Sequence, residues 1–175
     1  MMTYIGLLRA INVGGNNLIK MADLKEICGA LGYENVRTYI QSGNVAFESV
    51  ETDKAAMGVK MSEAIAASHG FAPPVFVLDK ADLRAAFDGL DLDFVEEKFV
   101  YFYFLKQAAT HAKIDEIEAL LKPDDAFKLT DKLFYLHCAE GAGKSKLAAK
   151  IDRLLGVKTT ARNLRTVKKL IELAG

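Results

Sequence analysis

The sequence has few of the residues that usually identify an enzyme or a metal protein. It contains two cysteines, Cys28 and Cys138, and three histidines, and these five residues are scattered without the spacing of metal ligands. No serine or cysteine has a recognisable base partner. The residues therefore predict neither a metal site nor a catalytic triad. No cofactor is expected, and the residues identify no reaction.

The chain also lacks a net charge, because 23 basic and 23 acidic residues cancel. A neutral chain has little electrostatic attraction for long nucleic acid, so tight binding that ignores sequence is not expected. No apolar run approaches the roughly 20 residues that a membrane span needs, and Arg9 interrupts the apolar N-terminus early. We therefore expect no membrane segment and no signal peptide. With reduced thiols as the simplest state of the two cysteines, a cytoplasmic location is predicted.

What is present is the composition of a folded protein. The 175 residues are 51% hydrophobic and 26% charged, which fits one large domain or two small ones. Hydrophobic periodicity and turn residues predict the same order of elements twice. The first set has strands over 3–10, 36–41, 45–49 and 75–79, with helices over 21–31 and 52–69. The second has strands over 98–105, 126–129, 133–138 and 157–160, with helices over 110–121 and 145–155, and a closing helix over 164–173.

Strand, helix, strand, strand, helix, strand is the order of a ferredoxin-like unit. We therefore predict an α+β fold of two tandem ferredoxin-like (βαββαβ) halves, residues 1–79 and 98–175, with the closing helix in the second half. An acidic helical connector over 80–97 joins them. A half of about 80 residues would be marginally stable alone, so we expect the two halves to pack as one cooperative body.

Polar residues gather at one edge of the first predicted half. In a ferredoxin-like unit the end of the first strand and the turn between the second and third strands meet at the same edge of the sheet. Glycine and asparagine let backbone N–H groups face an anion, a guanidinium binds phosphate or carboxylate, and a helix N-terminus adds positive charge. This predicts a ligand-binding group of Arg9, Asn12, Gly14, Lys20, Gln41, Ser42, Gly43 and Asn44. Alternatively, these residues only close tight turns and cap the helix.

A second polar loop follows the predicted strand 133–138. Its Gly143-Lys144-Ser145 resembles the end of a phosphate loop, but Cys138 stands where that pattern requires glycine. The chain after this loop is too short to build the sheet of a nucleotide hydrolase. Lys144 and Ser145 are therefore predicted to contact an anion at a helix N-terminus, or to form a plain turn in which Ser145 is the cap.

Charge is unevenly placed along the chain. Residues 144–169 carry nine basic residues and one acidic residue, whereas 79–125 carry twelve acidic and six basic residues. Such runs indicate a solvated helix face or a surface that meets an anion or RNA. Arg162 and Asn163, just before the closing helix, are predicted to turn toward a ligand.

Four segments carry a family resemblance: 7–15 (LLRAINVGG), 21–24 (MADL), 36–47 (VRTYIQSGNVAF) and 159–163 (TTARN). Over essentially its whole length the chain resembles a bacterial family called domain of unknown function 1697. The family usually has glycine at the position of Ala10 and an aromatic residue at the position of Leu164. The resemblance implies an α+β fold with two ferredoxin-like halves and no established reaction.

Three functional hypotheses follow from the sequence. The first is a binding protein for a small anionic ligand, such as a nucleotide or phosphorylated metabolite. The second is an RNA-binding module, because RNA-recognition motifs share the fold, although Asn44 and Ala46 stand where the third strand of that motif needs aromatic residues. The third is a non-catalytic protein-interaction module or homo-oligomer; no oligomeric state is predicted.

Overall fold

The computed structural model describes residues 1–41 and 43–175, so Ser42, which was predicted to bind a ligand, lies outside the described residues. The chain divides into two compact units, one of residues 1–85 with 170–175 and one of residues 86–169. The division falls inside two helices, and the boundaries expected at 79 and 97 stay predictions. None of the helices in the described part of the chain is long and apolar enough to cross a membrane.

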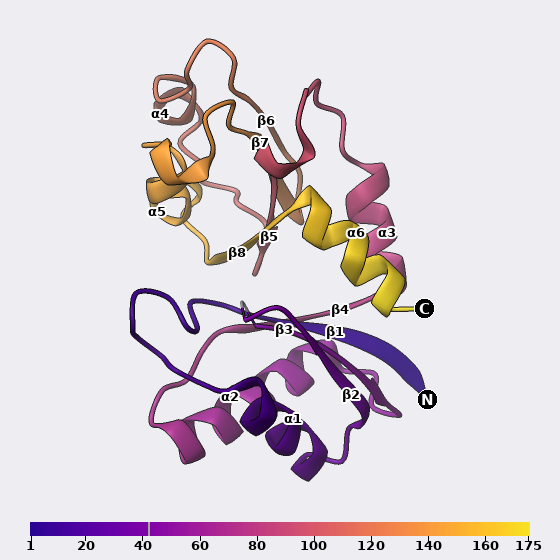
Figure 1. The fold of residues 1–175 in the computed structure, drawn as a ribbon. Coiled ribbons are helices and arrows are strands. Elements are labelled where there is room, and N and C mark those ends of the chain that lie inside the picture. The colour runs from indigo at the N-terminus through magenta and orange to yellow at the C-terminus, as the bar shows by residue number, and fades with distance from the viewer. Residues whose placement is uncertain (42) are drawn as a thin grey trace. The chain divides into compact units, whose positions relative to one another are not determined.

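The first unit is built on a four-stranded antiparallel sheet with strand order β2-β3-β1-β4. Its elements are β1 (Met2–Leu8), α1 (Met21–Ala30), β2 (Glu34–Tyr39), β3 (Asn44–Ser49), α2 (Lys54–His69) and β4 (Val75–Asp79), after which α3 (Lys80–Asp88) begins at once. Helices α1 and α2 cover the same face of this sheet (Figure 1). The buried core beneath them includes Leu24, Cys28, Met57, Met61 and Phe47.

Helix α2 shows how local sequence sets an element. Its N-terminus is capped by Asp53, whose carboxylate accepts the Ala56 N–H at 3.0 Å. The helix therefore begins at Lys54, two residues later than the range of 52–69 expected from the sequence. In the middle of the helix, a β-carbon at Gly58 would lie 2.8 Å from the Val75 carbonyl oxygen. Glycine is therefore required where α2 passes β4.

The second unit repeats the plan with the strand order β6-β7-β5-β8, again antiparallel throughout. Its elements are β5 (Val100–Leu105), α4 (Ile114–Glu118), β6 (Ala126–Leu129), β7 (Leu133–His137), α5 (Ile151–Leu155) and β8 (Thr159–Asn163), after which α6 (Leu164–Leu173) begins at once. Three short 3-10 turns accompany them: η1 (Glu97–Phe99), η2 (Ala142–Lys144) and η3 (Ala148–Lys150). The protein is thus α+β, with two four-stranded antiparallel sheets.

The helices of the second unit are shorter than the sequence predicts. Residues 110–121 contain only the single-turn helix α4, because the N–H of Lys113 donates to the Leu154 carbonyl at 2.8 Å instead of joining an earlier helical turn. The closing helix, in contrast, has the bounds expected from its pattern. The strand before it is Thr159–Asn163 rather than 157–160.

The predicted helix over 145–155 is likewise replaced by the turn η3 and the short α5. The Ser145 hydroxyl accepts the Ala148 N–H at 3.1 Å, and the Lys150 N–H bonds three residues back to Leu147 at 2.9 Å. Lys150 has φ −118, which is not helical. A full α-helix therefore begins only at Ile151.

The strand registers show which residues of the two units occupy equivalent positions. Tyr4 of β1 pairs with Asp79, and Tyr101 of β5 pairs with Asn163. Asp79 and Asn163 are the last residues of β4 and β8, and each side chain accepts an N–H three residues on, at 2.9 Å in both units. Each unit therefore has a helix cap of its own, and the two caps occupy equivalent positions in the repeat.

In the second sheet, alternation along β7 separates two faces. Phe134 and Leu136 belong to the core beside α4 and α5. Tyr135 and His137 point the other way, and the Tyr135 hydroxyl donates to the Ala86 carbonyl at 2.8 Å.

Candidate functional site

The loop after β1 and the turn between β2 and β3 lie side by side in the first unit. The Leu8 N–H donates to the Gly43 carbonyl at 2.8 Å, and the Asn12 side-chain amide donates to the Gln41 carbonyl at 3.1 Å. We call residues 9–20, 40–41 and 43–44 the Asn/Gly edge. The structure thus brings Asn12 beside Gln41, and the end of β1 beside Gly43.

Asparagine side chains hold the Asn/Gly edge in shape. The Asn12 amide also donates to the Ile19 carbonyl at 3.0 Å, and its oxygen accepts the Ile19 N–H at 2.9 Å. Asn17 closes the loop from the other side by donating to the Ala10 carbonyl at 3.0 Å. Asn12 is therefore a positioning residue, since these bonds occupy both ends of its side chain.

Unusual backbone conformations concentrate in these loops. Five non-glycine residues in the described chain have a positive φ, and four of them belong to the edge: Ala10 (54°), Asn12 (54°), Asn17 (51°) and Ile40 (51°). A positive φ in a β-branched residue such as Ile40 is a genuine outlier. Such strain persists only where surrounding bonds impose it, and it clusters at functional sites.

The members of the edge differ in access. Asn44 is fully buried and donates to the Tyr39 carbonyl at 3.0 Å, so it fixes the hairpin from within. Gly43 is also buried. Arg9 is half-buried, whereas Lys20 and Gln41 are exposed. The accessible polar side chains of the edge are therefore cationic or amide.

Helix α1 begins at this edge without a side-chain cap. Its N-cap residue is Lys20, which makes no capping hydrogen bond. The other described helices of at least eight residues, α2, α3 and α6, are capped by Asp53, Asp79 and Asn163. Gly14 lies nearby in an exposed turn closed by the Asn16 N–H on the Val13 carbonyl at 3.0 Å. The first N–H groups of α1 are therefore left for water or a ligand.

The other predicted site residues belong to the second unit, where each has a local role. Ser145 caps the turn that leads to α5, and Asn163 caps α6. Lys144 ends the turn η2 and is exposed, but the α-helix predicted to start beside it is not there. Arg162 is 8% exposed and donates to the Thr160 hydroxyl at 3.1 Å, and burial lowers the pKa of its guanidinium to about 10.

Neither cysteine is prepared for nucleophilic chemistry. Both thiols are free and buried, and burial raises the pKa of Cys28 to about 12. Burial also raises the pKa of Cys138, although a hydrogen bond with Ser145 opposes the shift. Thiolates, the reactive form, are therefore disfavoured. Among the described residues no group of three or more His, Cys, Asp or Glu residues is arranged to hold a metal ion.

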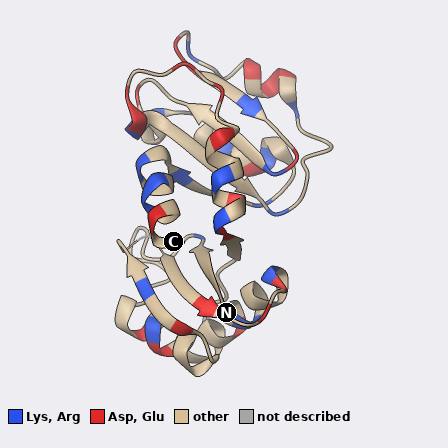
Figure 2. Ribbon diagram, turned by 90° about the vertical axis from the view of Figure 1, so that its right-hand side faces the viewer, with Lys and Arg blue, Asp and Glu red and all other residues tan. Residues whose placement is uncertain are grey.

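The basic run predicted between 144 and 169 continues into α6, where Figure 2 shows Lys and Arg on the helix that ends at the C-terminus. Lys168 of this helix forms an ion pair with Glu97, and its ammonium lies 6.0 Å from the centre of the Phe87 ring. The charge of Lys168 therefore interacts with residues of the protein itself.

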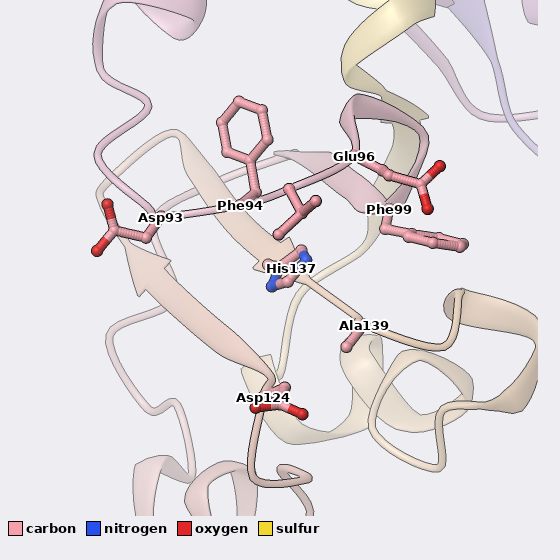
Figure 3. A pocket seen from close by; sticks show the side chains of 8 residues that line it. Asp93, Phe94, Glu96, Phe99, Asp124, His137 and Ala139 are labelled. Atoms are coloured by element: carbon pink, nitrogen blue, oxygen red, sulfur yellow. The ribbon is translucent and has the colours of Figure 1, made fainter.

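A pocket in the second unit was missed by the sequence analysis (Figure 3). It has a volume of about 460 Å³ and is lined by Asp93, Phe94, Val95, Glu96, Phe99, Asp124, His137 and Ala139. From the sequence, His137 was predicted to lie in a strand, without the spacing of a metal ligand, and no binding role was assigned to it. One signal was available, because Phe94 and Val95 are adjacent apolar residues inside an acidic segment.

The fold and the two sites define a class: α+β proteins built from two four-stranded antiparallel sheets, with polar loops at the sheet edges. Residues 1–135 match the family described as protein of unknown function (DUF1697), and the chain belongs to that family. It is similar to the solved structure of the conserved bacterial protein SP0830 from Streptococcus pneumoniae, with 27% identity, a TM-score of 0.73, and coverage of 99% of this chain and 98% of that one. No curated protein matches the chain.

Proposed function

We propose that this protein is a cytoplasmic binding protein for a small anionic ligand, a nucleotide or phosphorylated metabolite, which it holds at the Asn/Gly edge. The observation that carries the proposal is the N-terminus of α1. Helix α1 alone among the described helices of eight or more residues lacks a side-chain cap, and its N-cap residue is a lysine. An anion at this place would accept the uncapped N–H groups and meet the positive end of the helix.

Charge on the residues of the Asn/Gly edge supports the same ligand class. The Asn/Gly edge contains two cations, Arg9 and Lys20, and no acidic residue. Arg9 follows β1 directly, and its own N–H donates to the Pro74 carbonyl at 2.9 Å, so its backbone is fixed by the sheet. A guanidinium on a fixed backbone can form two charge-assisted hydrogen bonds to one phosphate.

Exposed apolar residues favour a nucleotide over a bare phosphate. Val13, Leu18 and Ile40 belong to the loops of the edge and are each more than half exposed. Exposed apolar side chains in the same loops as two cations suit a ligand with a flat or apolar part next to its anionic group. The strained backbone at Ile40 fits this view, because it holds that side chain outward.

We further propose that each half is ferredoxin-like. The element order βαββαβ and the antiparallel strand orders β2-β3-β1-β4 and β6-β7-β5-β8 support this assignment. RNA binding through the sheet is not favoured. Asn44 and Ala46, at the stacking positions of the third strand, are buried, and no base could stack on them.

Calorimetric titration of the purified protein with a panel of nucleotides, sugar phosphates and inorganic phosphate tests the proposal. We expect at least one phosphorylated compound to bind, and Arg9→Ala to weaken its affinity about tenfold or more, since a hydrogen bond between charged groups contributes about 1.5–3 kcal/mol. Lys20→Ala should weaken binding less, because an exposed ammonium is well screened.

Lys25→Ala is the matched control. Lys25 is an exposed lysine of the same helix, away from its N-terminus, so its loss changes the net charge equally without touching the edge. Equal losses in Lys20→Ala and Lys25→Ala would show that only net charge matters. A panel in which no anion binds, or binding that Arg9→Ala leaves intact, would remove the proposal.

A further inference from the structure

The imidazole of His137 is a buried polar group without a partner. His137 lies on the central strand β7, where its backbone pairs with Val100 on one side and Ala126 on the other. Its side chain is 8% exposed and makes no hydrogen bond or ion pair with any residue in the described chain. The ring lines the pocket in the centre of Figure 3. The residue is thus largely buried, and its imidazole, which bonds to no described residue, is left to water or a ligand in the pocket.

Three carboxylates line the same pocket as this ring. Asp93 and Asp124 line the pocket from two different loops, and neither forms an ion pair with a described residue. Glu96, the third carboxylate, is already paired with Lys98 at 2.7 Å. The pocket therefore keeps two negative charges at its rim, and these attract a cation and repel an anion.

Aromatic rings complete the wall. Phe94 is 37% exposed and its neighbour Val95 is 95% exposed, although both are large apolar residues. Phe99 already accepts a cation, because the Lys98 ammonium lies 4.6 Å from the centre of its ring. A second cation could lie against Phe94, whose ring contacts no other ring or cation in the described chain.

The first unit offers a comparison for the same position. The aligned registers of Tyr4 and Tyr101 place Glu48 of β3 where β7 has His137. Glu48 is satisfied within the protein, because its carboxylate accepts from the Asn35 side chain at 2.9 Å. The equivalent position in the second unit is left open to a ligand.

We propose that the His137 pocket binds a small organic cation, a primary amine or guanidinium carried on a short apolar stem. A nitrogen of the His137 imidazole accepts a hydrogen bond from the cation. Asp93 and Asp124 balance the charge of the cation, and the Phe94 ring covers its stem. The volume of about 460 Å³ is within the range of small-molecule sites. This site is independent of the Asn/Gly edge and takes a ligand of the opposite charge.

The test is an NMR titration of the full chain that follows the imidazole signals of His137. The probes are pentylamine and agmatine, with pentanol as the neutral analogue and pentanoate as the anion. We expect only the two cations to move the His137 signals, with an effect that weakens as salt is added. Equal shifts with pentanol or pentanoate, or no shift with any probe, would overturn the proposal.

Variants locate the binding energy. Asp124→Asn changes an exposed residue and should fold normally, and we expect about a threefold to tenfold loss of amine affinity from it. His137→Leu should lose about tenfold or more. Asp131→Asn is the control, because Asp131 is an exposed acid of the β6–β7 turn outside the pocket, and its affinity should not change. If Asp131→Asn weakens binding as much as Asp124→Asn, the attraction is general and the pocket is not the site.

The source of the cation is decided by a second arm with N-acetyl-lysine amide and N-acetyl-arginine amide. If these blocked residues shift the His137 signals at lower concentration than the free amines do, the ligand is a basic side chain of a polypeptide. If the free amines bind more tightly, it is a small metabolite. Both results support the assignment of a cation on an apolar stem.

Discussion

The two units of this protein follow one plan with almost no shared residues. In each unit, the N–H of the last residue of the first strand, β1 or β5, donates to a carbonyl in the turn between the second and third strands. The next N–H along the chain donates to the carbonyl of the residue just before the fourth strand. The four bonds are Leu8 to Gly43 and Arg9 to Pro74 in the first unit, and Leu105 to Lys132 and Lys106 to Lys158 in the second, all between 2.8 and 2.9 Å. The plan is therefore carried by backbone geometry, which many side chains satisfy.

The two units differ in the features that are not needed for their common fold. The first stores backbone strain at its Asn/Gly edge, while no described non-glycine residue of the second has a positive φ. The second instead leaves a buried histidine without a partner at a position where the first has a bonded glutamate. Both candidate sites thus lie where one copy departs from the other, because the shared parts form the hydrogen bonds of the fold.

The largest expected effect on stability comes from comparing two glycines of the first unit that both have a positive φ, Gly43 and Gly15. Gly43 has φ 77, and a β-carbon there would lie 2.9 Å from the Leu8 β-carbon and the Ile11 δ-carbon. We expect Gly43→Ala to lower the free energy of unfolding by about 3 kcal/mol, from strain and overpacking together. Gly15→Ala has the same kind of φ but nothing within 4 Å, and should cost only about 1 kcal/mol. Urea unfolding followed by circular dichroism measures both; equal costs would show that the contact with β1 is unimportant.

A second pair of variants compares buried tyrosine hydroxyls. Tyr33 in the first unit has a buried hydroxyl without a hydrogen-bond partner, whereas the Tyr135 hydroxyl donates to the Ala86 carbonyl at 2.8 Å. Tyr33→Phe should therefore raise the free energy of unfolding and Tyr135→Phe should lower it, each by about 1 kcal/mol. Thermal unfolding of both variants checks the opposite signs. A loss of stability in Tyr33→Phe would mean that its hydroxyl is bonded to water.

The smallest effect distinguishes the two equivalent helix caps by pH. Burial alone would raise the pKa of Asp79, but hydrogen bonds from Lys54 and from the N–H groups of Asp82 and Ala81 outweigh burial and lower that pKa below the usual value of an aspartate. The contribution of the charge is present above the unfolded pKa and is lost as the pH falls through the lower folded pKa.

Asp79→Asn keeps a cap oxygen but loses this charge. It should cost about 1 kcal/mol at pH 7, with allowance for solvent screening, and almost nothing at pH 2. Asn163→Ala removes an uncharged cap and should cost about 1 kcal/mol at both pH values. Unfolding curves at the two pH values decide the matter, and a pH-independent cost for Asp79→Asn would contradict the role of Lys54.

Much of the fold follows from local patterns, and the exceptions have physical causes. The closing helix was predicted with its observed bounds because Asn163 and the apolar spacing after it are local signals. The helices of the second unit were predicted too long, because the Lys113 N–H is taken by Leu154, a residue far away in sequence. Among the site residues, the meeting of the Asn12 loop and the Gln41 turn follows from strand order. The ligand-binding roles of these residues stay predictions.

The sequence by itself determined the order of elements, the repeat and the polar loops, because periodicity and turn chemistry act over a few neighbouring residues. Only the tertiary structure decided which polar side chains form hydrogen bonds within the protein and which do not. Asn12 and Asn44 proved to be bonded within the protein, while His137 proved to be buried without a bond. The satisfaction of a buried group depends on partners from distant segments, and no local pattern records them.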